Sequence, residues 1–226
     1  MSLYRMSALV LASTFFSLSC TSAPEPVPAS CIATKGSSAP AKPAALPVPA
    51  GNEIDSIAAT CAAGPVVLPA CPSAVTIDFQ QSHAPAAHID PPTPITYTEA
   101  PPTAGPHRSG WAKWGEFEYL PAQRWLHNLE HGGAALLYDP CADSQIIAQL
   151  RGFARCRQPD GGGQFRWVMT PYPGLGAAWS VVTWQWRIKG NCFDAAAVEA
   201  FLQQHYNKAE EDVASDGSWS YGWMGK

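Results

Sequence analysis

The distribution of aromatic residues limits where this chain can form a folded core. No aromatic residue occurs between Phe16 and Phe79, and all nine tryptophans lie between Trp111 and Trp223. Residues 21–74 are instead rich in proline, alanine and serine. Such a composition buries too little apolar surface to offset the entropy that is lost on folding. The sequence therefore predicts a semi-extended, disordered spacer over residues 21–74.

The remaining residues, 75–226, are predicted to form a single globular domain. About 150 residues are enough for one domain that buries about 70% of the surface of its unfolded chain. The whole chain has a net charge of −4, only 14% of its residues are charged, and no basic block occurs. Because nucleic acids and anionic membrane surfaces bind clusters of lysine and arginine, the composition argues against both as partners.

Residues 1–20 have the composition of an export signal. Arg5 supplies a positive charge, and residues 7–18 form an apolar run that is too short to span a membrane. A small residue precedes Cys20, as in bacterial lipoprotein signals, so we expect Cys20 to be the lipid attachment site. Ordinary secretion and a retained anchor are the alternatives, and all three imply export. Lipidation predicts a cell-envelope protein that is held to the membrane by its N-terminal lipid anchor.

Six cysteines remain if Cys20 carries a lipid. An even number in an oxidising compartment predicts disulfide bonds, but spacing alone does not choose among the pairings. No Cys-x-x-Cys pair occurs, which argues against a thioredoxin-type redox centre and against a cysteine-rich zinc finger. The six residues are Cys31, Cys61, Cys71, Cys141, Cys156 and Cys192.

Hydrophobic periodicity predicts an α+β domain with a small mixed sheet and two or three helices. Residues 89–110 contain six prolines, which exclude a helix and predict an irregular N-terminal half. A strand over 178–188 is expected to carry Trp184 and Trp186 on the same face. The other expected elements are strands at 134–138 and 165–169, and helices at 121–131, 143–154 and 194–206.

Residues 127–133, His-Asn-Leu-Glu-His-Gly-Gly, place two imidazoles four residues apart. On a short helix, His127 and His131 lie one turn apart, with Glu130 on much the same side. This arrangement presents two nitrogen ligands to one ion, and the order His-x-x-Glu-His matches the inverted zincin pattern. Four of the six histidines lie between His88 and His131. The sequence therefore predicts a functional site in this region.

Several motifs occur in a characteristic order around this site. They are Tyr97, the segment 101–107 (Pro-Pro-Thr-Ala-Gly-Pro-His), Gly115, the segment 127–133 and a hydrophobic strand that ends at Tyr138-Asp139. In this order they resemble the bacterial family of domains of unknown function numbered 3105 (DUF3105), from about His88 to about Phe201. Members of that family are often exported or membrane-attached. The resemblance implies a shared site at His88, His107, His127, Glu130 and His131, and it implies no particular activity.

A mononuclear metal site is the first hypothesis for these residues. Its ligands would be His107, His127 and His131, with His88 as a fourth ligand and Glu130 orienting the rings. Imidazole suits zinc, copper and nickel, whereas magnesium or calcium would need more carboxylates than cluster here. An exported protein also meets copper and zinc readily. The predicted function is therefore binding of copper or zinc for sequestration or delivery, and it requires His107 to approach the other two rings.

Two other functions remain open, so the sequence does not decide whether the protein is an enzyme. In a zinc hydrolase, Glu130 would act as the general base on a metal-bound water. The glycine pair directly after His131 argues against it, because zincin motifs lie within longer helices. Alternatively, the histidines are structural and bind backbone groups of the Pro-rich loop. The protein would then be an interaction module in which Trp111, Trp114 and Trp125 line a binding cleft for an unknown partner.

Overall fold

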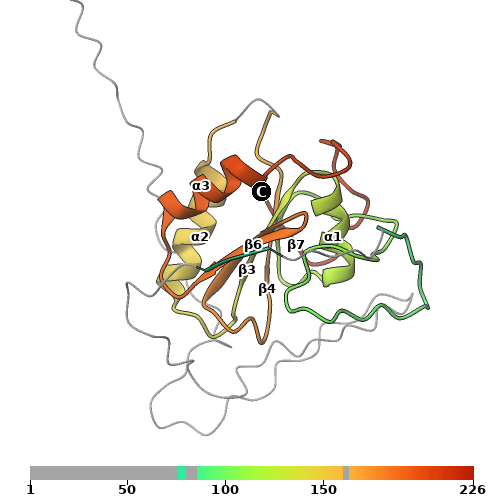
Figure 1. Ribbon diagram of the computed structural model, residues 1–226, viewed down its shortest axis with the longest axis horizontal. Helices are drawn as coiled ribbons and strands as arrows, with labels where there is room; N and C mark the ends of the chain where they lie inside the picture. Colours follow the sequence, from blue (N-terminus) through green and yellow to red (C-terminus); the bar gives the residue numbers. More distant parts are fainter. Residues whose placement is uncertain (1–75, 80–85, 160–162) are drawn as a thin grey trace, which may run out of the picture.

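The computed structural model describes residues 76–79, 86–159 and 163–226. These residues form a seven-stranded mixed sheet with helices on both faces (Figure 1). The predicted export signal and spacer lie outside the described residues, as do three of the six remaining cysteines. Lipidation of Cys20 and the pairing of the cysteines therefore stay predictions.

The strands of the sheet follow the order β1-β6-β5-β3-β4-β2-β7. Strand β4 pairs in parallel with β3 and β2, whereas the other neighbouring strands are antiparallel. The predicted α+β class with a mixed sheet is confirmed. In chain order the described elements are β1 (Thr76–Phe79), β2 (Gly115–Phe117), α1 (Ala122–Glu130), β3 (Ala134–Tyr138), α2 (Ser144–Cys156), β4 (Trp167–Pro171), β5 (Trp179–Thr183), β6 (Trp186–Gly190), α3 (Ala195–His205) and β7 (Trp223–Gly225).

The sheet separates two hydrophobic cores. Helices α2 and α3 cover one face, and α1 covers the other face (Figure 1). Neighbouring residues of β3 belong to different cores, because successive side chains of a strand point to opposite faces. Leu136 packs into the core beneath α2 and α3, and Leu137 packs into the core beneath α1. Burial of both faces explains why β3 is a continuous apolar run.

The three predicted helices are confirmed, and two of them begin at an aspartate. The Asp143 carboxylate accepts a hydrogen bond from the backbone nitrogen of Gln145, and Asp194 accepts one from Ala197. These bonds satisfy backbone donors that have no partner within the helix. No helix in the described part of the chain combines the length and the apolar composition needed to cross a membrane.

The prediction of a single strand over 178–188 is wrong. The segment is a hairpin in which β5 and β6 are joined by Trp184 and Gln185. Gln185 adopts a φ of 67°, a conformation that usually marks glycine or asparagine in a turn. The turn reverses the chain, so Trp184 and Trp186 contribute to opposite cores rather than to one face. No glycine or proline interrupts the alternating pattern of residues 178–188. Because these two residue types are the usual signals of a turn, the sequence did not predict one here.

The C-terminal segment returns to the region around α1. Asn207 donates from its backbone nitrogen to the oxygen of Gly132, and Glu211 donates from its backbone nitrogen to the oxygen of Glu130. Further along, Trp219 forms an isolated bridge with Ala112. This segment therefore runs along the end of α1, where the predicted site lies.

Candidate metal centre

Helix α1 and the turn that follows it position three of the predicted site residues. His127 and Glu130 lie in the last turn of α1, and His131 caps its end by donating from its backbone nitrogen to the oxygen of His127. The helix stops here because Gly132 has a φ of +79°, which other residues rarely adopt. A Cβ at Gly132 would also lie 2.7 Å from the side-chain oxygen of Asn207. The predicted termination by the glycine pair is confirmed.

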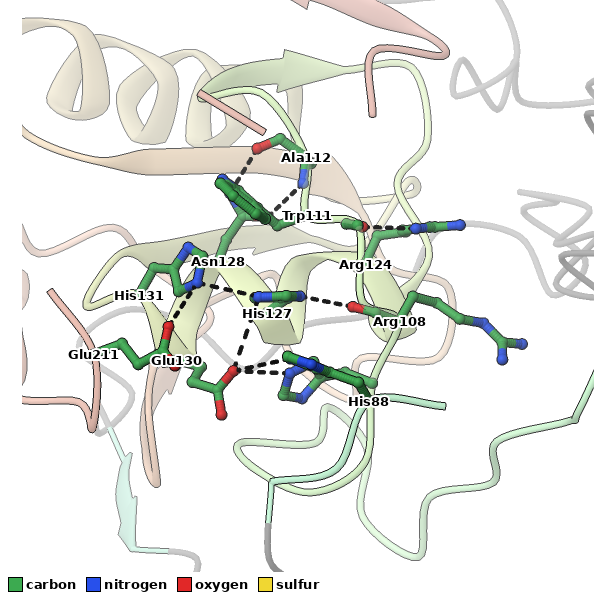
Figure 2. A network of polar contacts seen from close by, with 12 residues as sticks. His88, Arg108, Trp111, Ala112, Arg124, His127, Asn128, Glu130, His131 and Glu211 are labelled. Atoms are coloured by element: carbon green, nitrogen blue, oxygen red, sulfur yellow. Dashed lines mark hydrogen bonds and ion pairs between the residues drawn. The ribbon is translucent and has the colours of Figure 1, made fainter. Parts of the chain in front are cut away.

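Asn128 fixes the loop that approaches α1 from the Pro-rich half. Its side-chain oxygen accepts a hydrogen bond of 3.0 Å from the backbone nitrogen of Ala112, and its amide nitrogen donates one of 2.9 Å to the oxygen of Ala112 (Figure 2). Both residues are fully buried. The asparagine of the motif therefore acts as a two-point clamp on the backbone.

Removal of this clamp is expected to destabilise the fold. Asn128→Ala leaves a buried backbone donor and a buried acceptor without partners, which costs about 2–4 kcal/mol of unfolding free energy. Urea unfolding monitored by circular dichroism measures the change. Asn128→Asp is the comparison: it keeps an acceptor for the Ala112 nitrogen but directs a buried carboxylate oxygen at the Ala112 carbonyl, so its midpoint should also fall well below that of wild type. Equal midpoints for Asn128→Ala and wild type would show that the two hydrogen bonds of Asn128 to Ala112 do not stabilise the fold.

The Pro-rich segment brings His88 and His107 side by side. The backbone nitrogen of Ile89 donates to the oxygen of His107, and the nitrogen of His107 donates to the oxygen of Ala87, which forms a parallel bridge. The Arg108 guanidinium donates to two further carbonyl oxygens of the segment. Backbone pairing and Arg108 thus hold this irregular segment in place. The Nε2 atoms of the two histidines take no part in this pairing and face Glu130.

The carboxylate of Glu130 is the point on which three histidines converge. Its Oε2 lies 3.0 Å from Nε2 of His107. It also lies 3.5 Å from Nε2 of His88 and 3.9 Å from Nε2 of His127 (Figure 2). The ligand atoms of these four residues all lie within 4.8 Å of one another. The sequence required His107 to approach both His127 and His131. His107 approaches His127, with 4.8 Å between the ring centroids, whereas the ligand atom of His131 groups with those of Glu130 and Glu211 instead. Glu130 therefore lies among the candidate ligands rather than behind them.

The other nitrogen of two of these rings faces the backbone. Nδ1 of His107 lies 2.9 Å from the oxygen of Gly105, and Nδ1 of His127 lies 2.7 Å from the oxygen of Arg108. A carbonyl oxygen only accepts, so each Nδ1 carries the hydrogen. In a neutral ring, Nε2 then carries the lone pair, which faces Glu130 in His107 and faces Nε2 of His131 in His127. Metal-bound histidines are commonly oriented in this way.

Burial affects the charges of the cluster. The pKa of His127 is lowered to about 4, mainly by burial; the Arg108 carbonyl opposes this shift, and the charges of the neighbouring histidines add to it. Burial acts to raise the pKa of Glu130, but the hydrogen bond to His107 and the nearby histidines outweigh this, and the pKa lies below its usual value. At neutral pH, the cluster therefore presents a neutral His127 ring and an ionised carboxylate.

The close contact between His107 and Glu130 requires a positive charge. His107 is fully buried and Glu130 is 5% exposed, so water screens their charges poorly. With Nδ1 already donating, a neutral His107 would direct a lone pair at a carboxylate that only accepts. Either a proton makes His107 an imidazolium, or a metal ion takes the position of that proton.

His131 belongs to a second, adjoining group. Its Nε2 lies 2.9 Å from Oε2 of Glu211 and 3.1 Å from Nε2 of His127 (Figure 2). Glu130, His131 and Glu211 place their ligand atoms within 4.8 Å of one another. Sequence reasoning missed Glu211, because it lies far along the chain from the motif and no local pattern distinguishes it from Glu210. Only the folded C-terminal segment brings it to the site.

Two of the three tryptophans predicted to line a cleft are core residues. Trp125 is fully buried and Trp114 is 3% exposed, and both pack in the core beneath α1. Trp111 is half-buried and packs against the rings of His127 and His131, with centroid distances of 5.2 Å and 4.5 Å. Trp111 thus packs against two rings of the histidine cluster, and Trp114 and Trp125 are not available to line a cleft.

A comparison with family models covers the part of the chain that holds this site. The model described as "Protein of unknown function (DUF3105)" matches residues 88–217, which is more than half of the chain. The chain belongs to the DUF3105 family. The match begins at His88 and includes both residue groups, so the predicted resemblance is confirmed. Searches of curated proteins and of solved structures each found no match.

Proposed function

We propose that this DUF3105 protein binds a transition metal ion, copper(II) or zinc(II), at the cell envelope and sequesters or delivers it. The ligands are Nε2 of His88, His107 and His127 together with Oε2 of Glu130. The convergence of three imidazole nitrogens on one buried carboxylate is the observation that carries this proposal. Export and attachment of the chain through a lipid on Cys20 form part of the same proposal, and they rest on the sequence of residues 1–20.

The distances within the group suit a tetrahedral ion. Ligand atoms at about 2.0–2.1 Å from a tetrahedral zinc lie about 3.3–3.4 Å from one another. The three distances from Glu130 to the histidines, 3.0, 3.5 and 3.9 Å, bracket this value. The distances among the three histidine nitrogens are at most 4.8 Å.

The donor atoms favour zinc(II) or copper(II) over other ions. Three imidazoles and a single carboxylate suit zinc and copper, whereas magnesium and calcium require sites built from oxygen, and copper(I) prefers sulfur ligands. The neutral state of His127 at pH 7 keeps its lone pair available, since the pKa of this ring is about 4. At pH 7 a proton therefore does not compete with a metal ion for the His127 ring.

One edge of the site is open, which suits exchange of the ion. The side chain of His88 is 48% exposed, whereas His107 and Glu130 are buried. An ion bound from this side would meet His88 first and the buried ligands afterwards. Uptake and release through an exposed histidine fit sequestration or delivery better than permanent structural binding.

The metal content of the untagged full-length protein tests the proposal. After incubation with zinc or copper and removal of free metal, elemental mass spectrometry should find at least about one ion per chain, as expected for a mononuclear site. The double variant His107→Asn, His127→Asn should lose it, although asparagine can still donate to the two carbonyls. His205→Ala is the matched control, because His205 lies on α3 at the other face of the sheet. A metal-free wild type, or a double variant that holds as much metal as wild type, would contradict the proposal.

A further inference from the structure

We propose that the centre is dinuclear, with a second divalent metal ion bound by His131, Glu211 and Glu130. This inference rests on the proposed function, because Glu130 would bridge the two ions. The first ion would keep His88, His107 and His127, and the second would take Nε2 of His131 and a carboxylate oxygen of Glu211.

The two groups adjoin closely enough for a shared carboxylate. Nε2 of His127, in the first group, lies 3.1 Å from Nε2 of His131, in the second, and Glu130 belongs to both groups. In known two-metal sites the ions lie about 3.5–4 Å apart, often with a carboxylate between them. The Glu130 carboxylate belongs both to a group with three histidines and to a group with His131 and Glu211, as a bridging carboxylate would.

The C-terminal segment holds Glu211 in position for this role. Its backbone nitrogen donates a hydrogen bond of 3.1 Å to the oxygen of Glu130. The next residue, Asp212, pairs with the Arg166 guanidinium at 2.7 Å, and the same guanidinium donates to the backbone oxygen of His131. Asp212 is therefore engaged with arginine, and Glu211 directs its carboxylate at His131. The segment is fixed at both residues before any ion arrives.

The second group combines a buried ligand with an exposed one. His131 is 3% exposed, and its Nε2 is the ring atom that faces Glu211. Glu211 is half exposed, which leaves room for water to complete the coordination of the second ion.

The alternative is a simple hydrogen bond from His131 to Glu211, and zinc stoichiometry distinguishes the two. Wild-type protein saturated with zinc should hold about two ions per chain, as in two-metal sites. Glu211→Gln should hold about one ion, because only the second group loses its carboxylate. Glu210→Gln is the matched control, since it makes the same change of charge one residue away and should behave as wild type. His131→Gln should match Glu211→Gln, and circular dichroism checks that each variant folds.

Copper(II) gives an independent measurement of the same arrangement. Two copper(II) ions bridged by Glu130 would couple magnetically, so wild type should show a paramagnetic resonance signal well below its copper content. Glu211→Gln should restore a full signal from a single copper. One zinc ion per chain in both wild type and Glu211→Gln would overturn the dinuclear centre and leave the mononuclear site in place. Two ions in both proteins would overturn the role of Glu211, and no bound zinc would overturn both proposals.

Discussion

Replacement of Glu130 by glutamine is expected to abolish metal binding at the centre. Glutamine has nearly the shape of glutamate but lacks the negative charge and the second acceptor oxygen. The carboxylate is the point to which three Nε2 atoms are directed and the proposed bridge to the second group. Loss of groups that only orient ligands already costs about 10–100-fold in metal affinity. We therefore expect zinc affinity to fall by at least about 100-fold.

Competition titration with a zinc-binding dye measures this affinity. Glu118→Gln, at an exposed position on the same domain, makes the same change of charge and should leave the affinity unchanged. Glu130→Asp keeps the charge but withdraws it by one methylene, so it should bind zinc with intermediate affinity. A Glu130→Gln protein that binds zinc as tightly as wild type would show that the carboxylate is not a ligand.

The metal-free protein is expected to lose stability in mild acid because of His127. The pKa of this ring is about 4 in the folded protein and about 6.5 when unfolded. Between these values the unfolded state binds more protons, so the free energy of unfolding falls as the pH falls. The contribution of His127 is complete above pH 6.5 and is lost progressively toward pH 4. Each pH unit is worth about 1.4 kcal/mol at most, so the loss between pH 7.5 and pH 4.5 is about 2–3 kcal/mol.

Urea unfolding of chelator-treated protein at both pH values measures this loss. His127→Asn is the comparison, because asparagine does not titrate and can still donate to the Arg108 carbonyl. Burial also lowers the pKa of His131, and the lowered pKa of Glu130 acts in the same direction at lower pH. Between the two pH values, His127→Asn should therefore lose less free energy of unfolding than wild type. The loss that remains comes from His131 and Glu130. Identical pH dependence in the two proteins would mean that His127 is already charged in the folded state.

Much of the fold could be predicted because it depends on local patterns. Apolar spacing and an aspartate cap defined α2 and α3, and the glycine pair defined the end of α1. The hairpin between β5 and β6 could not be predicted, since Gln185 takes a turn conformation that its side chain does not signal. The short strands β2 and β7 depend on pairing between distant segments rather than on their own residues.

The site was predicted in part for the same reason. The spacing of His127, Glu130 and His131 on a helix is local, and the family resemblance added His88 and His107. Which of these residues form one group depends on where α1 ends. One residue past the helix, His131 faces Glu211 rather than His107. The position of Glu130 among the histidines and the arrival of Glu211 both follow from tertiary contacts that no sequence spacing encodes.

An anomalous difference map from crystals of the zinc-loaded protein, recorded at the zinc edge, tests the central claim most directly. The account predicts a peak about 2.0–2.2 Å from Nε2 of His107, Nε2 of His127 and a carboxylate oxygen of Glu130. A second peak about 3.5–4 Å away, beside His131 and Glu211, would be the second ion. A map without a peak among these residues, with His107 Nε2 bonded directly to Glu130, would show that a proton rather than a metal ion joins them.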